Sequence, residues 1–349
     1  MNQADTIRAS FRQQAKACTR MGSPFTGMVV ALLADSLDRS TRTGRRVLDW
    51  DGVPDATGDA LALRLAGAFR ALVNRGRLPV LAALYPPAEQ PEAAPLSAAL
   101  RQALAEADDE LATFLDYAPQ TNEVARSGVL YPGLVTIARE TGLPLSLFEL
   151  GASAGLNLIP DRYRYTLGSQ AFGDRTSEVH ICPAWSGADP VGPDPVITSR
   201  RGCDLNPLDL TDVEQRARMI AYIWPDQAVR LARIEAAIDR AIADPPAIDR
   251  LDAADWVEAR IGADADPGTT RVLFHSIAFQ YMPNATKTRI DAVMEKAGDA
   301  ASADRPLAWL SFELDPAMRP ELTLTLWPGG VTRKLADADP HVRSVNWIG

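Results

Sequence analysis

Apolar residues recur at helical spacing from the start of the chain to about residue 141. Over residues 59–76 they form one stripe, and Gly76 stands where a glycine commonly ends a helix. That stripe consists of Leu61, Leu65, Phe69, Leu72 and Val73. A second helix is predicted from Pro95 onward, with leucines at positions 100, 104, 111 and 115 on its apolar face. The pattern therefore predicts an all-α N-terminal domain over residues 1–143.

From residue 144 the pattern changes to short apolar runs that alternate with helical segments, predicted over residues 226–243 and 284–297. The predicted strands are residues 144–151, 197–204, 270–277, 307–314, 322–327 and 331–335. The last two flank the turn Pro328-Gly329-Gly330 and so form a late antiparallel hairpin. Residues 160–199 contain the irregular run PAWSGADPVGPDP and are interpreted as an insertion. The alternation predicts an α/β domain over residues 144–349, with a doubly wound, mostly parallel Rossmann-type sheet.

The 349 residues include 36 basic and 45 acidic side chains, and the resulting formal charge of −9 argues against nucleic-acid binding. The longest apolar stretch, residues 27–34, is far short of the roughly 20 residues that cross a bilayer. The N-terminus lacks the apolar core of a secretory signal. Three cysteines and three histidines are too scattered for a disulfide framework or a metal centre. We therefore expect a soluble cytoplasmic protein that binds a small molecule and no metal.

The sharpest local signal is the run ELGASAGLN at residues 149–157, which allows two interpretations. In the first it is a nucleotide-type glycine loop, in which Gly151 and Gly155 let the backbone turn and a ligand lies against exposed N–H groups. In the second, Gly151-x-Ser153-x-Gly155 is the nucleophile elbow of a serine hydrolase, with a downstream histidine as its base. The helical character of the preceding region and the lack of an HGGG-like segment count against the hydrolase. An ordinary tight turn would also explain the glycines.

Four longer runs carry a family resemblance: ELGASAGLNLIPDRYRY, RRGCDLNPLDL, WPDQ and FHSIAFQYMP. Together with QTNEV at residues 120–124, they resemble a bacterial domain-of-unknown-function family numbered 2332, over most of the chain. The C-terminal part looks like the Rossmann domain of a class I S-adenosylmethionine-dependent methyltransferase. In those enzymes the first glycine loop wraps the amino-acid end of S-adenosylmethionine, although a glycine is commonest where this chain has Ser153. The resemblance implies cofactor contacts from Glu149, Gly151, Ala152, Ser153, Gly155 and Asn157.

Acidic residues also follow two further predicted strands. Asp204, with Asn206 beyond it, ends the strand 197–204, where a carboxylate can accept hydrogen bonds from both ribose hydroxyls. An aspartate that opens a turn before Asn-Pro explains the same residues. Asp255 and Trp256 follow the predicted third strand, and the methyltransferase resemblance implies that they contact the adenine amino group and ring. Alternatively, Asp255 caps a helix over residues 256–261.

The end of the strand 270–277 carries the candidates for the chemical step. In enzymes that the chain resembles, methyl acceptors are usually held there, and His275 could take a proton from the acceptor. Tyr281 is the second catalytic candidate, and Gln280 could orient a substrate. A structural histidine and a polar loop edge are the alternatives for these residues.

In the helical region, Thr121, Asn122, Glu123 and Arg126 form a polar cluster between apolar helices. A helix cap explains part of this cluster. The functional interpretation is that Asn122, Glu123 and Arg126 bind the substrate in a cleft shared with the sheet edge, because clefts between domains are common binding sites.

The sequence thus predicts an S-adenosylmethionine-binding protein that transfers a methyl group to an unidentified small molecule. A non-catalytic nucleotide-binding or sensor protein of the same fold is the alternative. A serine hydrolase that uses Ser153 is the third possibility.

Overall fold

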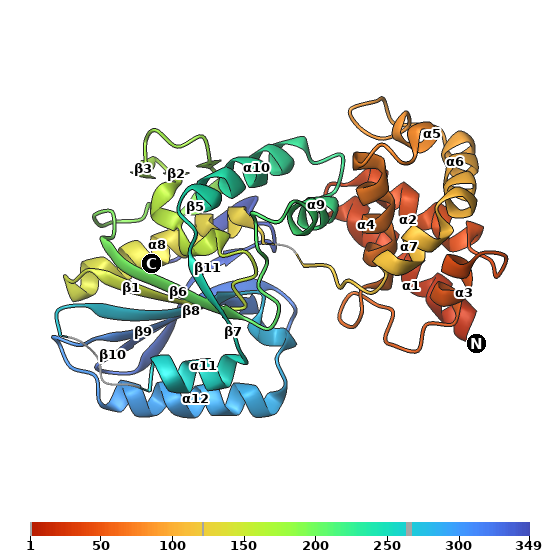
Figure 1. The fold of residues 1–349 in the computed structure, drawn as a ribbon. Helices are drawn as coiled ribbons and strands as arrows, with labels where there is room; N and C mark the ends of the chain where they lie inside the picture. Colours follow the sequence, from red (N-terminus) through yellow and green to blue (C-terminus); the bar gives the residue numbers. More distant parts are fainter. Residues whose placement is uncertain (1, 121, 263–266) are drawn as a thin grey trace. The chain divides into compact units, whose positions relative to one another are not determined.

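The computed structural model describes residues 2–120, 122–262 and 267–349 (Figure 1). The chain folds into two compact units. The helical unit comprises Met1–Thr121 and Asp212–Ala232, and the sheet unit comprises Asn122–Thr211 and Arg233–Gly349. Helix α10 (Ala228–Ala243) begins in the helical unit and continues in the sheet unit.

The helical unit is built from short helices around one apolar core. They are α1 (Gln3–Arg20), α2 (Pro24–Ser36), α3 (Arg42–Leu48), α4 (Leu61–Asn74), α5 (Pro79–Ala82), α6 (Ala93–Glu106), α7 (Asp108–Phe114) and α9 (Val213–Ala221). The predicted stripe lies on α4, where Leu61, Leu65 and Phe69 are fully buried. Gly76 follows α4 with φ +70°, the left-handed conformation that ends a helix.

The helix predicted from Pro95 onward is two helices, α6 and α7. They are separated at Ala107, whose φ of −125° is not helical. Three acidic residues begin α7, where negative charge favours a helix N-terminus, and they mark a new start rather than a continuation. Leu100 of α6 and Leu111 of α7 nevertheless enter the same core.

The sheet unit contains a nine-stranded sheet in the order β5-β12-β11-β10-β9-β8-β1-β6-β7. The strands are β1 (Leu145–Leu150), β5 (Ala184–Gly187), β6 (Ile197–Asp204), β7 (Ala247–Arg250), β8 (Thr270–Ser276), β9 (Leu307–Leu314), β10 (Pro320–Trp327), β11 (Val331–Ala338) and β12 (Ser344–Trp347). Neighbours from β7 to β9 are parallel, and neighbours from β9 to β12 are antiparallel. The predicted α/β fold is confirmed, and the late hairpin of β10 and β11 is part of a larger antiparallel group.

Helices cover both faces of this sheet (Figure 1). Helix α8 (Ser127–Thr141) packs against one face, and its Gly133 has no room for a side chain because a Cβ there would lie 2.8 Å from Leu310 of β9. Helices α11 (Ala253–Arg260) and α12 (Asn284–Asp299) cover the other face, where Trp256 and Met294 join Leu150 and Leu273 in a second apolar layer.

The boundary between the units lies at residue 121 rather than at the predicted residue 143. Residues Val129, Leu134 and Ile137 of α8 are buried against the sheet, so the segment before β1 belongs to the sheet unit. A helical pattern alone does not state which core its apolar face will join.

The segment 160–199 is more ordered than its composition indicates. It forms a small separate sheet of β2 (Arg164–Leu167), β3 (Gln170–Gly173) and β4 (His180–Ile181) in the order β3-β2-β4. It also supplies β5, which pairs with β12 at the edge of the main sheet. These strands have two to four residues, which is too short for a periodic pattern to reveal them.

Candidate functional site

The strand order of the sheet reverses between β1 and β8. From β1 the chain moves outward to β6 and β7, and it then returns to β8 on the other side of β1. Ligands of open α/β sheets bind at the carboxyl ends of the strands at such a reversal. Leu150 of β1 lies beside Cys203 of β6 and His275 of β8, so the three strands end at one level. We refer to these strand ends and the loops that follow them as the carboxyl edge.

The loop after β1 needs glycine at two positions. Gly151 has φ +64°, and a Cβ there would lie 2.7 Å from the Cβ of Ala278, beyond the end of β8. Gly155 has φ +74°, and a Cβ there would lie 2.6 Å from Pro246. Both the left-handed conformation and the close approach of neighbours therefore exclude larger residues. Ser153 between them also has a positive φ, +55°.

The backbone N–H groups of this loop bond to the protein itself. Ala152 N–H donates to Cys203 O at 3.0 Å, and Gly155 N–H donates to Ala152 O at 2.7 Å. Leu156 N–H donates to Asn122 Oδ1 at 2.7 Å. The expected cradle of exposed N–H groups is thus not what the structure has, because acceptors of the protein occupy these donors.

The element after the loop is the 3₁₀ turn η2 (Leu156–Leu158) rather than an α-helix. The anion-binding N-terminus that usually follows a phosphate-binding loop is therefore missing here. Asn157 in this turn is buried, and its side chain accepts from Ser127 Oγ at 2.9 Å and donates to Glu123 O at 3.4 Å. Asn157 and the buried Ala152 thus fix the loop from inside the protein.

Asp204 joins the loops that follow β1 and β6. One carboxylate oxygen accepts from Ser153 N–H at 2.9 Å, and the other accepts from Asn206 N–H at 2.8 Å. The second bond is the turn expected of an aspartate before Asn-Pro. Asp204 remains half-buried and Asn206 is exposed, so both reach the surface of the carboxyl edge. An ionised carboxylate has about four acceptor positions, which leaves capacity for a ligand.

Two buried oxygens at this edge have no hydrogen-bond partner among the described residues, Glu149 Oε2 and Ser153 Oγ. Glu149 is 1% exposed. Burial, and then the charge of Asp204, raise the pKa of Glu149 well above its usual value, against the opposing charge of Arg126. Unpartnered buried polar atoms are rare in folded proteins, so this pair is the feature of the edge that most favours a bound group.

His275 is held on both sides of its ring. Nδ1 lies 2.7 Å from Glu313 Oε1, and the indole N–H of Trp309 donates to Nε2 at 3.0 Å. Because an indole can only donate, Nε2 is the acceptor and Nδ1 carries the proton. The ring is 1% exposed and stacks on Phe279 at 4.8 Å. Both nitrogens are therefore engaged inside the protein, and the predicted base role of His275 would require one of these bonds to break.

Glu313 completes this arrangement at the end of β9. Its carboxylate also accepts from the N–H groups of Ala278 at 2.9 Å, Phe279 at 3.0 Å and Gln280 at 3.4 Å. It thereby fixes the turn η4 (Phe279–Tyr281) that follows β8. In this turn, the side chain of Gln280 is half-buried and that of Tyr281 is 62% exposed. Both polar side chains are therefore accessible from solvent.

Asp255 and Trp256 lie in the first turn of helix α11, and Trp256 is too buried for its predicted contact with the adenine ring. Helix α11 begins at Ala253 with Asp252 as its cap, so Asp255 is inside the helix and is not the cap. Asp255 pairs with Arg289 of α12 at 2.7 Å. The indole of Trp256 is 1% exposed and donates to Asp249 at 2.7 Å, so no face is left for a ligand ring.

The segment before α8 packs against the glycine loop within the sheet unit. Asn122 accepts a hydrogen bond from Leu156 N–H, and Glu123 O accepts one from the side chain of Asn157. In addition, Arg126 donates to Ser276 O at 2.8 Å and to Pro340 O at 3.2 Å. The expected proximity of this segment to the loop is present, but it arises within one unit and not between two domains. Thr121, which belonged to the same prediction, lies outside the described residues.

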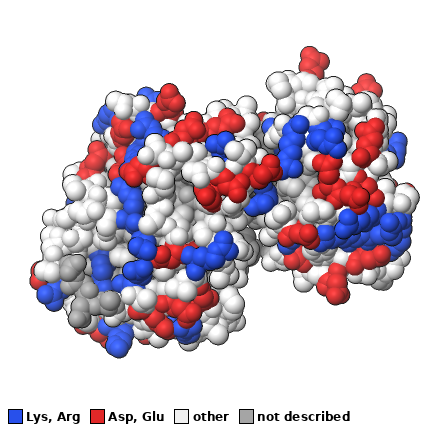
Figure 2. All heavy atoms as spheres, viewed as in Figure 1, with Lys and Arg blue, Asp and Glu red and all other residues white. Residues whose placement is uncertain are grey.

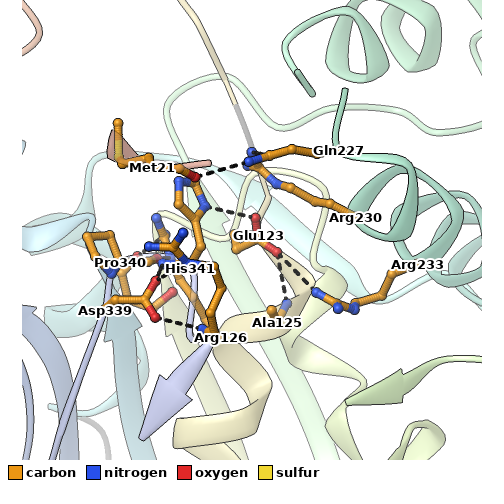
Figure 3. A network of polar contacts seen from close by, with 12 residues as sticks. Met21, Glu123, Ala125, Arg126, Gln227, Arg230, Arg233, Asp339, Pro340 and His341 are labelled. Carbon is orange, nitrogen blue, oxygen red and sulfur yellow. Dashed lines mark hydrogen bonds and ion pairs between the residues drawn. The ribbon is translucent and has the colours of Figure 1, made fainter. Parts of the chain in front are cut away.

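Glu123 is the centre of a buried polar network (Figure 3). Its side chain is 3% exposed, and it accepts from Ala125 N–H at 3.1 Å. His341 Nδ1 lies 3.2 Å from the other oxygen, and Arg233 Nη1 lies 4.0 Å from the first. The backbone N–H of Ala125, the imidazole of His341 and the guanidinium of Arg233 thus hold the Glu123 side chain in place. The contacts of Glu123 with His341 and Arg233 were not predicted, because nothing in the sequence connects positions 123, 233 and 341.

The described residues also bear on two further questions, metal binding and the spanning of a membrane. They contain no group of three or more His, Cys, Asp or Glu residues that could hold a metal ion. Across the same residues, no helix is both long and apolar enough to cross a bilayer. Figure 2 shows acidic and basic side chains intermingled on one face of the molecule.

Residues 8–347 match the family model described as "Uncharacterized protein conserved in bacteria (DUF2332)", and the chain belongs to that family. No curated protein matches the chain. No solved structure matches it either.

Proposed function

We propose that this chain binds S-adenosylmethionine at the carboxyl edge and transfers its methyl group to a small molecule. The observation that carries the proposal is the strand order β7-β6-β1-β8-β9, with the glycine loop at the end of β1, where the order reverses. The two buried oxygens without partners, on Glu149 and Ser153, support a ligand at the same place. The charge of a bound ammonium or sulfonium group would favour the ionised form of Glu149, whose pKa burial otherwise raises.

The residues that would hold the cofactor are side chains rather than loop amides. Asp204 and Asn206 lie at the surface beside the loop and can meet hydroxyl groups. Gln280 and Tyr281 stand on the other side of β1, beyond β8, and mark the far side of the proposed site. When bound, the cofactor supplies a methyl group on a positively charged sulfur. The lone pair of the acceptor would form the new bond to the methyl carbon, and the electron pair of the broken C–S bond would remain on sulfur.

The contribution of the protein to this reaction is positioning and exclusion of water, since the methyl group is already activated. His275 has no free nitrogen, so the acceptor would have to present its lone pair without help from that residue. The same observation favours a second candidate function, in which the chain binds the cofactor and does not transfer the methyl group. A nucleophilic Ser153 is disfavoured, because its Oγ has no hydrogen-bond partner among the described residues and hence no base.

Calorimetric titration with S-adenosylmethionine and S-adenosylhomocysteine tests the proposal. Gly151→Ala introduces a Cβ only 2.7 Å from Ala278 and should displace the loop, weakening binding at least about tenfold, or about 1.4 kcal/mol. Gly142→Ala is the matched control: its φ is +67°, against +64° for Gly151, but a Cβ there meets no atom within 4 Å. The control variant should lose similar stability and keep its affinity.

The proposal fails if the wild-type protein shows no binding up to about 1 mM ligand, which corresponds to only about −4 kcal/mol. It also fails if the two glycine variants bind equally well. Formation of S-adenosylhomocysteine in the presence of candidate acceptors separates the two functions: a protein that binds the cofactor tightly and never produces S-adenosylhomocysteine is the non-catalytic one.

A further inference from the structure

A cavity of about 290 Å³ lies behind the glycine loop in the sheet unit. Ala154 of the loop lines one side, and Leu208 and Leu210 of the loop after β6 line another. Ala241 and Ile242, at the end of α10, and Ile248 of β7 complete the apolar wall. None of these residues was among the predicted site residues.

The cavity is structurally coupled to the carboxyl edge. Leu208 N–H donates to Ser153 O at 3.1 Å, and the carboxylate of Asp204 bonds to the N–H groups of Ser153 and Asn206. The same two loops therefore form the cavity wall and carry the polar groups proposed to hold the cofactor. A molecule in the cavity would lie next to that site and not in it.

The lining determines what could bind. The described residues around the cavity include one acidic group, Asp209, and no lysine, arginine or histidine. Asp209 is exposed at the rim, where its carboxylate accepts from the N–H of Thr211 at 2.9 Å. The cavity is open to solvent on one side, but an anion in it would meet apolar walls, gain no cation from the lining and face a carboxylate at the rim. The volume is just below the roughly 300–1,000 Å³ of ligand pockets, which limits the ligand to a small molecule.

We infer that this cavity is a binding site for a small, uncharged and largely apolar molecule, and that it holds the methyl acceptor. The second part rests on the proposed function. Both parts agree with the engaged nitrogens of His275, because a neutral nitrogen or sulfur atom presents its lone pair without prior removal of a proton.

Two fluorescent probes with a similar aromatic body test the inference: neutral N-phenyl-1-naphthylamine and anionic 8-anilino-1-naphthalenesulfonate. The wild-type protein should bind the neutral probe saturably and at least about tenfold more tightly than the anionic one, a difference of about 1.4 kcal/mol. Asp209→Asn should reduce this difference, because it removes the carboxylate at the rim.

In Leu208→Trp, the larger side chain fills the cavity from the half-buried loop. This change should weaken the affinity for the neutral probe at least about tenfold. Val196→Trp is the control, since Val196 is 66% exposed and does not line the cavity. Thermal unfolding shows whether both variants are folded. Calorimetry with S-adenosylhomocysteine measures separately the affinity of the neighbouring cofactor site.

Absence of saturable binding of the neutral probe overturns the inference, as does equal binding by Leu208→Trp and the wild type. Equal or tighter binding of the anionic probe overturns the proposed ligand class. Loss of S-adenosylhomocysteine binding in a folded Leu208→Trp variant would make the cavity part of the cofactor site and overturn the acceptor assignment. If the wild type binds the neutral probe as expected but no S-adenosylhomocysteine, the cavity stands as a binding site and the proposed function fails.

Discussion

Replacing Glu313 by glutamine isolates the role of the carboxylate that holds the end of β8. In the wild type, Oε1 accepts from His275 Nδ1 at 2.7 Å and from the N–H groups of Ala278 and Phe279 at 2.9 and 3.0 Å. The side chain is only 15% exposed, so water cannot replace these bonds. Glutamine keeps the shape and one acceptor oxygen but removes the charge.

The expected loss follows from those three bonds. Hydrogen bonds to a charged group contribute about 1.5–3 kcal/mol and neutral ones about 0.5–1.5, so each bond weakens by roughly 1 kcal/mol. Three bonds give a loss of about 3 kcal/mol in the free energy of unfolding. For a unit of this size the midpoint of thermal unfolding should fall by about 6–12 °C.

The effect should depend on pH with a definite sign. Burial alone would raise the pKa of Glu313, but the hydrogen bonds from His275 and from the backbone of residues 278 and 279 hold it below its usual value. A carboxyl group with a lowered pKa stabilises the folded state above its unfolded pKa of about 4.3, and that stabilisation is lost as the pH falls through the folded value. The difference between wild type and Glu313→Gln should therefore be full at neutral pH and shrink in acid.

Thermal unfolding followed by circular dichroism between about pH 3.5 and pH 7 measures this difference. Glu321→Gln is the control, since Glu321 pairs with Lys334 at 3.2 Å on a more exposed surface and should contribute less than about 1 kcal/mol. If Glu313→Gln costs no more than the control, or the same at every pH, the carboxylate does not hold the turn. Because we assign Glu313 and His275 to structure, affinity for S-adenosylhomocysteine should survive in the folded variant.

Two further variants test the unpartnered oxygens at the carboxyl edge. Because the folded pKa of Glu149 is raised, the wild type loses stability as the pH rises from the unfolded pKa of about 4.3 toward the folded value. Glu149→Gln should therefore gain stability relative to the wild type between about pH 5 and pH 8. A relative stability that is constant over this range would contradict an ionising, buried Glu149. Ser153→Ala removes an oxygen without a partner and should change the free energy of unfolding by less than about 1 kcal/mol. The wild type should also resist a fluorophosphonate probe, and stoichiometric labelling of Ser153 would make the chain a hydrolase.

The sequence predicts strands well where a long apolar run is bounded by breakers. The apolar strand β9 (Leu307–Leu314) has the predicted limits. The mostly polar strand β6 (Ile197–Asp204) has them as well. The short strands of the segment 160–199 contain too few residues for alternation to be seen, and their pairing depends on distant partners such as β12. Similarly, the apolar face of α8 is visible in the sequence, whereas the core that it joins is not.

Site residues are harder to predict, because their partners are set by strand register and helix phase. His275 looks like a free base until Glu313 and Trp309, 38 and 34 positions away, are placed on the neighbouring strand. Trp256 is predicted to pack on an adenine ring, but its indole is 1% exposed and donates to Asp249 of β7. This contact depends on how the helix packs on the sheet, which the sequence does not show.

The contacts of the carboxyl edge explain why its glycine loop departs from a nucleotide-binding pattern. Asn122 and Asp204 bond to the N–H groups of Leu156 and Ser153, which a ligand would otherwise have to satisfy. A loop held in this way is already ordered before a ligand arrives, so binding costs little conformational entropy. Its glycines are needed for packing against Ala278 and Pro246 rather than for access to the backbone. Recognition at this edge then depends on side chains that face outward, and a search for further ligands should begin from Asp204, Asn206 and Gln280 and not from the glycine spacing.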